Sequence, residues 1–258
     1  MADLRNYQMR AAAGTRVDTG IDEGLRAYMI KVYNLMALGL AITGVAALGT
    51  VWLATTGDPA AAVATLPNGK LLTAFGAALY GSPLRWVVML APLGMVFFLS
   101  YRVHKMSVSA AQTTFWVFAA LMGLSLSSIF LVYTSASIVQ TFFITATAFG
   151  ALSLFGYTTK RDLTGWGSFL IMGVFGLIIA MIVNIFLASP ALQFAISAIG
   201  VLVFAGLTAY DTQKIKEMYF EGDEVLVAGR KAIMGALTLY LDFINLFTFL
   251  LSFLGNRE

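Results

Sequence analysis

The sequence predicts an all-α integral membrane protein with seven transmembrane helices. Of its 258 residues, 59% are hydrophobic and only 11% are charged, which is too apolar for a water-soluble globule of this size. The apolar residues also form long uncharged runs, each of the roughly 20 residues needed to cross the hydrocarbon core or a multiple of that length. Lysine and arginine fall between these runs, so the runs are separate spans.

Residues 1–27 mix arginines with aspartates and contain no apolar run, so we expect a cytoplasmic N-terminal tail. The first span is predicted at 28–54. Residues 55–83 are interrupted by proline and glycine, and we expect a loop that carries a short interfacial helix. The second span follows at 86–101, where two flanking arginines can extend toward the membrane surface.

Residues 106–159 contain no formal charge and are long enough, at about 80 Å of helix, for two crossings. We place the turn between them at 133–137. Two more spans are predicted within 163–210, separated at 188–190, where Pro190 can occupy the first position of a helix. The seventh span, 232–254, has Asp242 as its single formal charge.

The distribution of lysine and arginine predicts the orientation of the seven-helix domain, residues 28–258. The basic residues recur in alternate connections, and short basic loops remain on the cytoplasmic side. The sequence therefore predicts a cytoplasmic N-terminus and a C-terminus on the opposite side of the membrane.

Asp242 is the first candidate functional residue. An ionised carboxylate near the centre of a transmembrane helix costs about 3 kcal/mol on insertion scales. On a helix, Asp242 shares one face with the small and polar residues Gly235, Thr238, Asn245 and Ser252. The alternative is that Asp242 is protonated or hydrogen-bonded and only holds helices together.

Asp211 is the second candidate, at the end of the sixth span. The alternative for Asp211 is a solvated charge at a helix boundary. If the last helix began at Lys231, Asp242 would lie about 16 Å inward and Asp211 within one turn of the edge. The two could still meet if the sixth helix is tilted, if the last helix begins below the membrane surface, or if a water-filled vestibule reaches them.

Several classes of chemistry are not expected. The chain has no cysteine and one histidine, which excludes thiolate chemistry and a multi-histidine metal site. We found no catalytic motif, so we expect no enzyme activity, no permanently bound cofactor and no nucleic-acid partner.

Two strings, AYDTQKI at 209–215 and LYLDFINLFTFLLSFLG at 239–255, resemble the signature of the Bax inhibitor-1 family, also called the transmembrane Bax inhibitor motif family. The similarity extends more loosely over all seven spans. It implies a fold in which the last helix is surrounded by the other six. It also implies a proton-sensitive pair of aspartates, here Asp211 and Asp242, in a calcium-permeable leak path.

The resemblance further implies an arginine that latches to this pair, for which Arg102 is the candidate. Thr208, Thr238 and Asn245 are candidate pore-lining residues. Asp211 and Asp242 are also the candidate metal ligands, and two carboxylates would bind calcium weakly because Ca²⁺ takes six to eight oxygen ligands.

A second reading, from a different functional class, is a membrane-embedded regulator that binds other membrane proteins, such as a quality-control protease. The N-terminal tail would be its natural contact. For either function we expect a lipid bilayer, calcium ions and protons as partners, and a bacterial inner membrane as the location.

Overall fold

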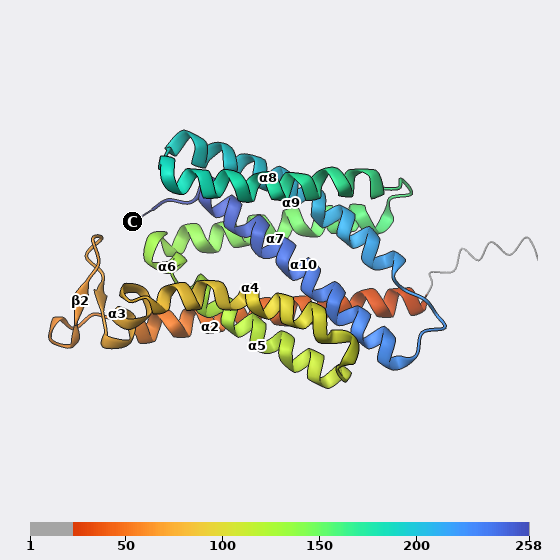
Figure 1. The fold of residues 1–258 in the computed structure, drawn as a ribbon, viewed down its shortest axis with the longest axis horizontal. Coiled ribbons are helices and arrows are strands. Elements are labelled where there is room, and N and C mark those ends of the chain that lie inside the picture. Colours follow the sequence, from red (N-terminus) through yellow and green to blue (C-terminus); the bar gives the residue numbers. More distant parts are fainter. Residues whose placement is uncertain (1–22, 258) are drawn as a thin grey trace, which may run out of the picture.

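The computed structural model describes residues 23–257, so the expected tail lies largely outside the described residues (Figure 1). Within them, seven helices are long and apolar enough to cross a membrane. The prediction of a seven-span, all-α membrane protein is therefore confirmed. The long helices run along the long axis of the molecule, and successive helices reverse direction (Figure 1).

The first helix, α2 (Glu23–Ala54), starts before the predicted position. The connection after it holds the expected short helix, α3 (Ala74–Gly81). The same connection forms a small sheet that the sequence did not predict. Its strands β1 (Thr55–Thr56), β2 (Ala64–Thr65) and β3 (Leu71–Leu72) pair in the antiparallel order β1-β3-β2.

The middle helices follow the predicted runs. They are α4 (Leu84–Arg102), α5 (Val108–Leu126), the single turn α6 (Ile129–Val132), α7 (Ser135–Thr158) and α8 (Thr164–Leu187). The side chains of Ser107 and Thr134 cap α5 and α7 by accepting a hydrogen bond from the N–H group three residues later. The break predicted at 133–137 is found, but it is shorter and comprises only Tyr133 and Thr134, because α7 already begins at Ser135.

The last two helices differ from the prediction in their lengths. Helix α9 (Pro190–Glu217) begins at the expected proline but extends past Tyr210, and α10 (Val225–Leu254) begins before Ala232. Charged residues mark where a helix leaves the hydrocarbon, whereas a helix can continue into the polar layer. The polar connection is therefore much shorter than the sequence indicated.

Helix α10 is the central element, but four of the other six spans pack directly on it, whereas the resemblance implied all six. Half of the residues in its most apolar 18-residue stretch are buried, whereas the corresponding share is 39% or less in each of the other spans. It packs directly on α9, α2, α7 and α5, while α4 packs on α5 and α8 packs on α9 in an outer layer. The large residues of α10, such as Leu239, Phe243 and Leu246, are buried among these helices.

The outer surface is apolar. In α8, Ile185 is 76% exposed and Phe186 is 83% exposed, and Trp52 of α2 is 79% exposed. Large apolar side chains in such numbers on an outer surface indicate contact with lipid rather than with water. The protein is thus a multi-pass membrane protein.

Candidate carboxyl-pair site and family

The site is built on the packing of α9 against α10. These helices are antiparallel, and glycines bring them close together. A Cβ added at Gly235 would lie 2.9 Å from Ile215, and one added at Gly200 would lie 2.5 Å from the ring of Phe249. Ser197 donates a hydrogen bond to Ser252 over 2.9 Å. The polar face predicted for the last helix is therefore turned toward α9.

This packing brings Asp211 and Asp242 together. Their carboxyl groups lie within hydrogen-bonding reach of each other. The difference in depth between the two aspartates that the sequence predicts disappears, because α10 starts well beyond the end of α9. From Gly235 back to Val225 the helix spans about 15 Å, whereas α9 continues for only about 3 Å past Ile215.

The surroundings of Asp242 offer few donors. Asp242 is 5% exposed, and its Oδ2 atom receives no hydrogen bond from the N–H groups and alcohols of residues 23–257. Asp211 is half-buried and lies one helical turn before the exposed Lys214. Ionised carboxylates have no proton to donate, so a direct hydrogen bond between the two groups requires that they share one proton.

The other candidate residues take different positions. Thr208 is fully buried and donates to the carbonyl of Phe204 over 2.8 Å. Thr238 and Asn245 are half-buried on α10, on either side of Asp242. Arg102 lies exposed in the last turn of α4, and no ion pair joins it to either aspartate in the described part of the chain.

The structure adds polar residues that the sequence did not single out. Tyr33 of α2 hydrogen-bonds to Ser153 of α7 over 2.6 Å, and Ser153 bonds to Thr212 of α9 over 2.9 Å. Thr212 directly follows Asp211, so this chain of hydroxyls connects three helices beside the carboxyl pair. In the sequence, these hydroxyl contacts are indicated only by the i, i+4 spacing of Thr208 and Thr212, which places both on one face of a helix.

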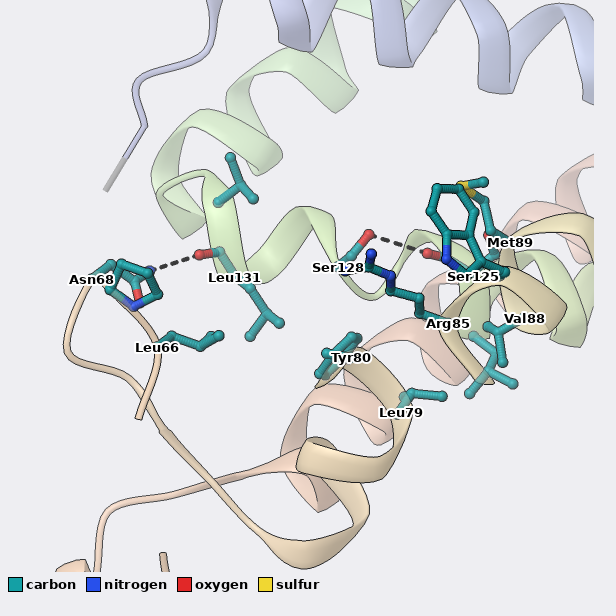
Figure 2. Close-up of a pocket in the computed structure, with 14 residues that line it drawn as sticks. Leu66, Asn68, Leu79, Tyr80, Arg85, Val88, Met89, Ser125, Ser128 and Leu131 are labelled. Atoms are coloured by element: carbon teal, nitrogen blue, oxygen red, sulfur yellow. Dashed lines mark hydrogen bonds between the residues drawn. The ribbon is translucent and has the colours of Figure 1, made fainter. Parts of the chain in front are cut away.

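A separate cavity of about 520 Å³ lies at the end of the bundle that holds the C-terminus. Figure 2 shows it between the loop at Asn68, the start of α4 and the α5–α6 region, with Arg85 extending toward Ser128. Neither aspartate lines it. This cavity is therefore distinct from the carboxyl pair.

Comparison with known proteins agrees with the resemblance. Residues 25–258 match the protein family described as "Inhibitor of apoptosis-promoting Bax1". The chain belongs to this Bax inhibitor family. The match covers all seven spans and includes both aspartates.

Bacterial relatives of this family member are similar over nearly their whole length. Inner membrane protein YbhL of Escherichia coli is 46% identical over 237 residues, which cover 91% of this chain and 94% of YbhL. A protein of Caulobacter vibrioides is 48% identical over the full length of both chains. A protein of Rickettsia prowazekii is 50% identical over 92% of each chain.

Proposed function

We propose that this Bax inhibitor family member is a pH-sensitive calcium leak channel, and that the Asp211–Asp242 pair is its gate. The observation that carries the proposal is the pair itself. One carboxyl lies buried on the central helix, and the other reaches it from the neighbouring helix. A buried acid is costly in a membrane and commonly marks an ion or proton pathway.

The chemistry of the pair supports a gate. A shared proton allows the two carboxyls to hydrogen-bond and hold α9 against α10. Loss of that proton leaves two like charges, which repel each other and attract a hard divalent cation such as calcium. Flux is therefore expected to be low when the pair is protonated and to rise with pH.

The remaining residues are assigned roles within this proposal. Thr208, Thr238 and Asn245 would line the path on both sides of the pair, and Arg102 would latch to a deprotonated carboxylate after a movement of α4. Calcium passes as the transported ion and is held only weakly, because two carboxylates supply few of its ligands. We place the protein in a bacterial inner membrane, as the name of the relative YbhL supports.

Calcium flux into proteoliposomes tests the gate. Asp211→Asn and Asp242→Asn should each remove most of the pH dependence of the flux, because each removes one titrating partner. Asp162→Asn is the matched control. Asp162 is exposed in the α7–α8 connection, and hydrogen bonds from the hydroxyl and amide of Thr164 hold its pKa below the ordinary value.

Because of this lowered pKa, Asp162 stays ionised from pH 5 upward, about one unit above the ordinary aspartate pKa, and its loss should leave the pH profile unchanged. Wild-type pH dependence in both Asp211→Asn and Asp242→Asn would contradict the proposal. So would an equal loss of pH dependence in Asp162→Asn.

A further inference from the structure

A long groove runs along the membrane-facing side of the bundle, between α2 and α7. It consists of three adjoining cavities of about 610, 440 and 300 Å³. The cavities adjoin because neighbouring ones share lining residues. The first two share Met36, Ala37 and Phe149, and the last two share Leu40, Gly44, Phe142 and Phe243.

The central helix forms the floor of this groove. Phe243, Ile244 and Phe247 of α10 line its inner part. In Figure 1, the diagonal α10 crosses both α2 and α7, and both pack on it. The groove is therefore the space that α10 leaves open between its two neighbours.

Small residues keep the groove open. Gly44 on α2 and Gly150 on α7 line it, and no atom lies within 4 Å of the position where a Cβ would stand at either residue. The lining of α2 extends from Arg26 to Leu48, which is about 33 Å of helix. The hydrocarbon core of a bilayer is about 30 Å thick, so the groove crosses both leaflets and the half nearest Arg26 lies in one of them.

The two ends of the groove differ in polarity. Arg26, Tyr33 and Tyr157 line the mouth near the start of α2. Beyond Ser153 the lining is almost wholly aliphatic and aromatic, and the hydroxyl of Thr43 is already hydrogen-bonded within the bundle. A cationic side chain at one end and an apolar groove behind it match a phospholipid, in which a phosphate and acyl chains are joined through glycerol.

We propose that the α2–α7 groove binds one membrane phospholipid. Arg26 pairs with the phosphate, as guanidinium groups do in charge-assisted bonds. One acyl chain runs from Arg26 past Met36 and Phe149 and ends near Phe243, where it covers part of the side of the central helix that α2 and α7 leave open. The bound lipid is thus part of the packing of α10, whatever ion the protein conducts.

Native mass spectrometry of the full chain, delipidated in detergent and mixed with phosphatidylglycerol as the probe, tests this proposal. The double variant Gly44→Leu/Gly150→Leu places two leucines in the groove. It should reduce the retained lipid about tenfold at equal lipid concentration. The protein should remain folded, because both positions have open space for a side chain.

The matched control is Gly94→Leu/Gly176→Leu. These glycines are also exposed and have no atom within 4 Å of a Cβ position, but they lie on α4 and α8, away from the groove. Lipid retention should stay within about twofold of the wild type. Equal retention in both double variants, or equal loss in both, would overturn the proposal.

A second pair of variants tests the phosphate contact. Arg26→Gln should weaken retention about threefold to tenfold, whereas Lys105→Gln, which removes an exposed charge outside the groove, should have no effect. Conversion of a dimer to a monomer by the two groove leucines, with no loss of lipid, would assign the groove to a second copy of the chain and reject the lipid.

Discussion

The hydroxyl of Tyr240 lies in the centre of the bundle, where it can be tested by single substitutions. Tyr240 is fully buried, and its ring packs edge-on against Phe115 and Phe118 at 5.8 and 5.3 Å. Its hydroxyl bonds to Thr43 Oγ1 over 2.6 Å. Thr43 also contacts two backbone carbonyls, so its own proton has other acceptors. Tyr240 therefore depends on Thr43 more than Thr43 depends on Tyr240.

We predict that Thr43→Val destabilises the protein more than Tyr240→Phe does. Tyr240→Phe removes one hydrogen bond, at a cost of about 1 kcal/mol, whereas Thr43→Val leaves a buried hydroxyl without its partner, which costs about 1–3 kcal/mol. Thermal unfolding in detergent measures both changes. Tyr101→Phe serves as the control, because Tyr101 is 79% exposed. The opposite order of the two buried variants would contradict this account.

At the scale of helices, glycine contacts set the spacing of α7, α9 and α10. A Cβ added at Gly156 of α7 would lie 2.2 Å from the carbonyl oxygen of Ala209, two residues before Asp211. Because the clash is with backbone, α7 must move away from α9. We predict that Gly156→Ala lowers the free energy of unfolding by about 1–3 kcal/mol, as overpacking does.

Gly150→Ala is the control on the same helix, where a Cβ meets no atom within 4 Å. It should be neutral or stabilising by up to about 1 kcal/mol, because alanine favours helix more than glycine does. Denaturation of the two variants in one detergent compares them. Equal stability of Gly156→Ala and Gly150→Ala would show that the α7–α9 contact is not constrained at this point.

The spans could be predicted from the sequence, whereas the contacts between distant helices could not. Hydropathy and the turn residues located the spans, since the cost of burying charge and the start at Pro190 are local properties. The cost of burying a charge also identified Asp242 as a candidate, without reference to any other residue. The position of Asp211 beside it could not be derived by counting, because it depends on how α9 and α10 are staggered. The α2–α7 groove depends on which helices α10 keeps apart.

At the scale of the whole molecule, the distribution of charge between the two ends carries the orientation proposal. Of the thirteen lysine and arginine residues within 23–257, ten lie at the end that holds the start of α2. The other three, Lys70, Arg85 and Arg257, lie at the end that holds the C-terminus. Seven spans place the two ends on opposite sides of the membrane, and the basic end is expected to be cytoplasmic.

Cysteine labelling in bacterial cells tests this orientation, since the natural chain contains no cysteine. We expect Ala61→Cys, in the exposed connection between α2 and α3, to react with a membrane-impermeant maleimide before the inner membrane is opened. Lys105→Cys and Lys160→Cys, in connections at the basic end, should react only afterwards. The reverse pattern would reject the orientation but keep the seven spans. Reaction of all three before opening would contradict the spans, because a continuous bilayer must separate the two ends.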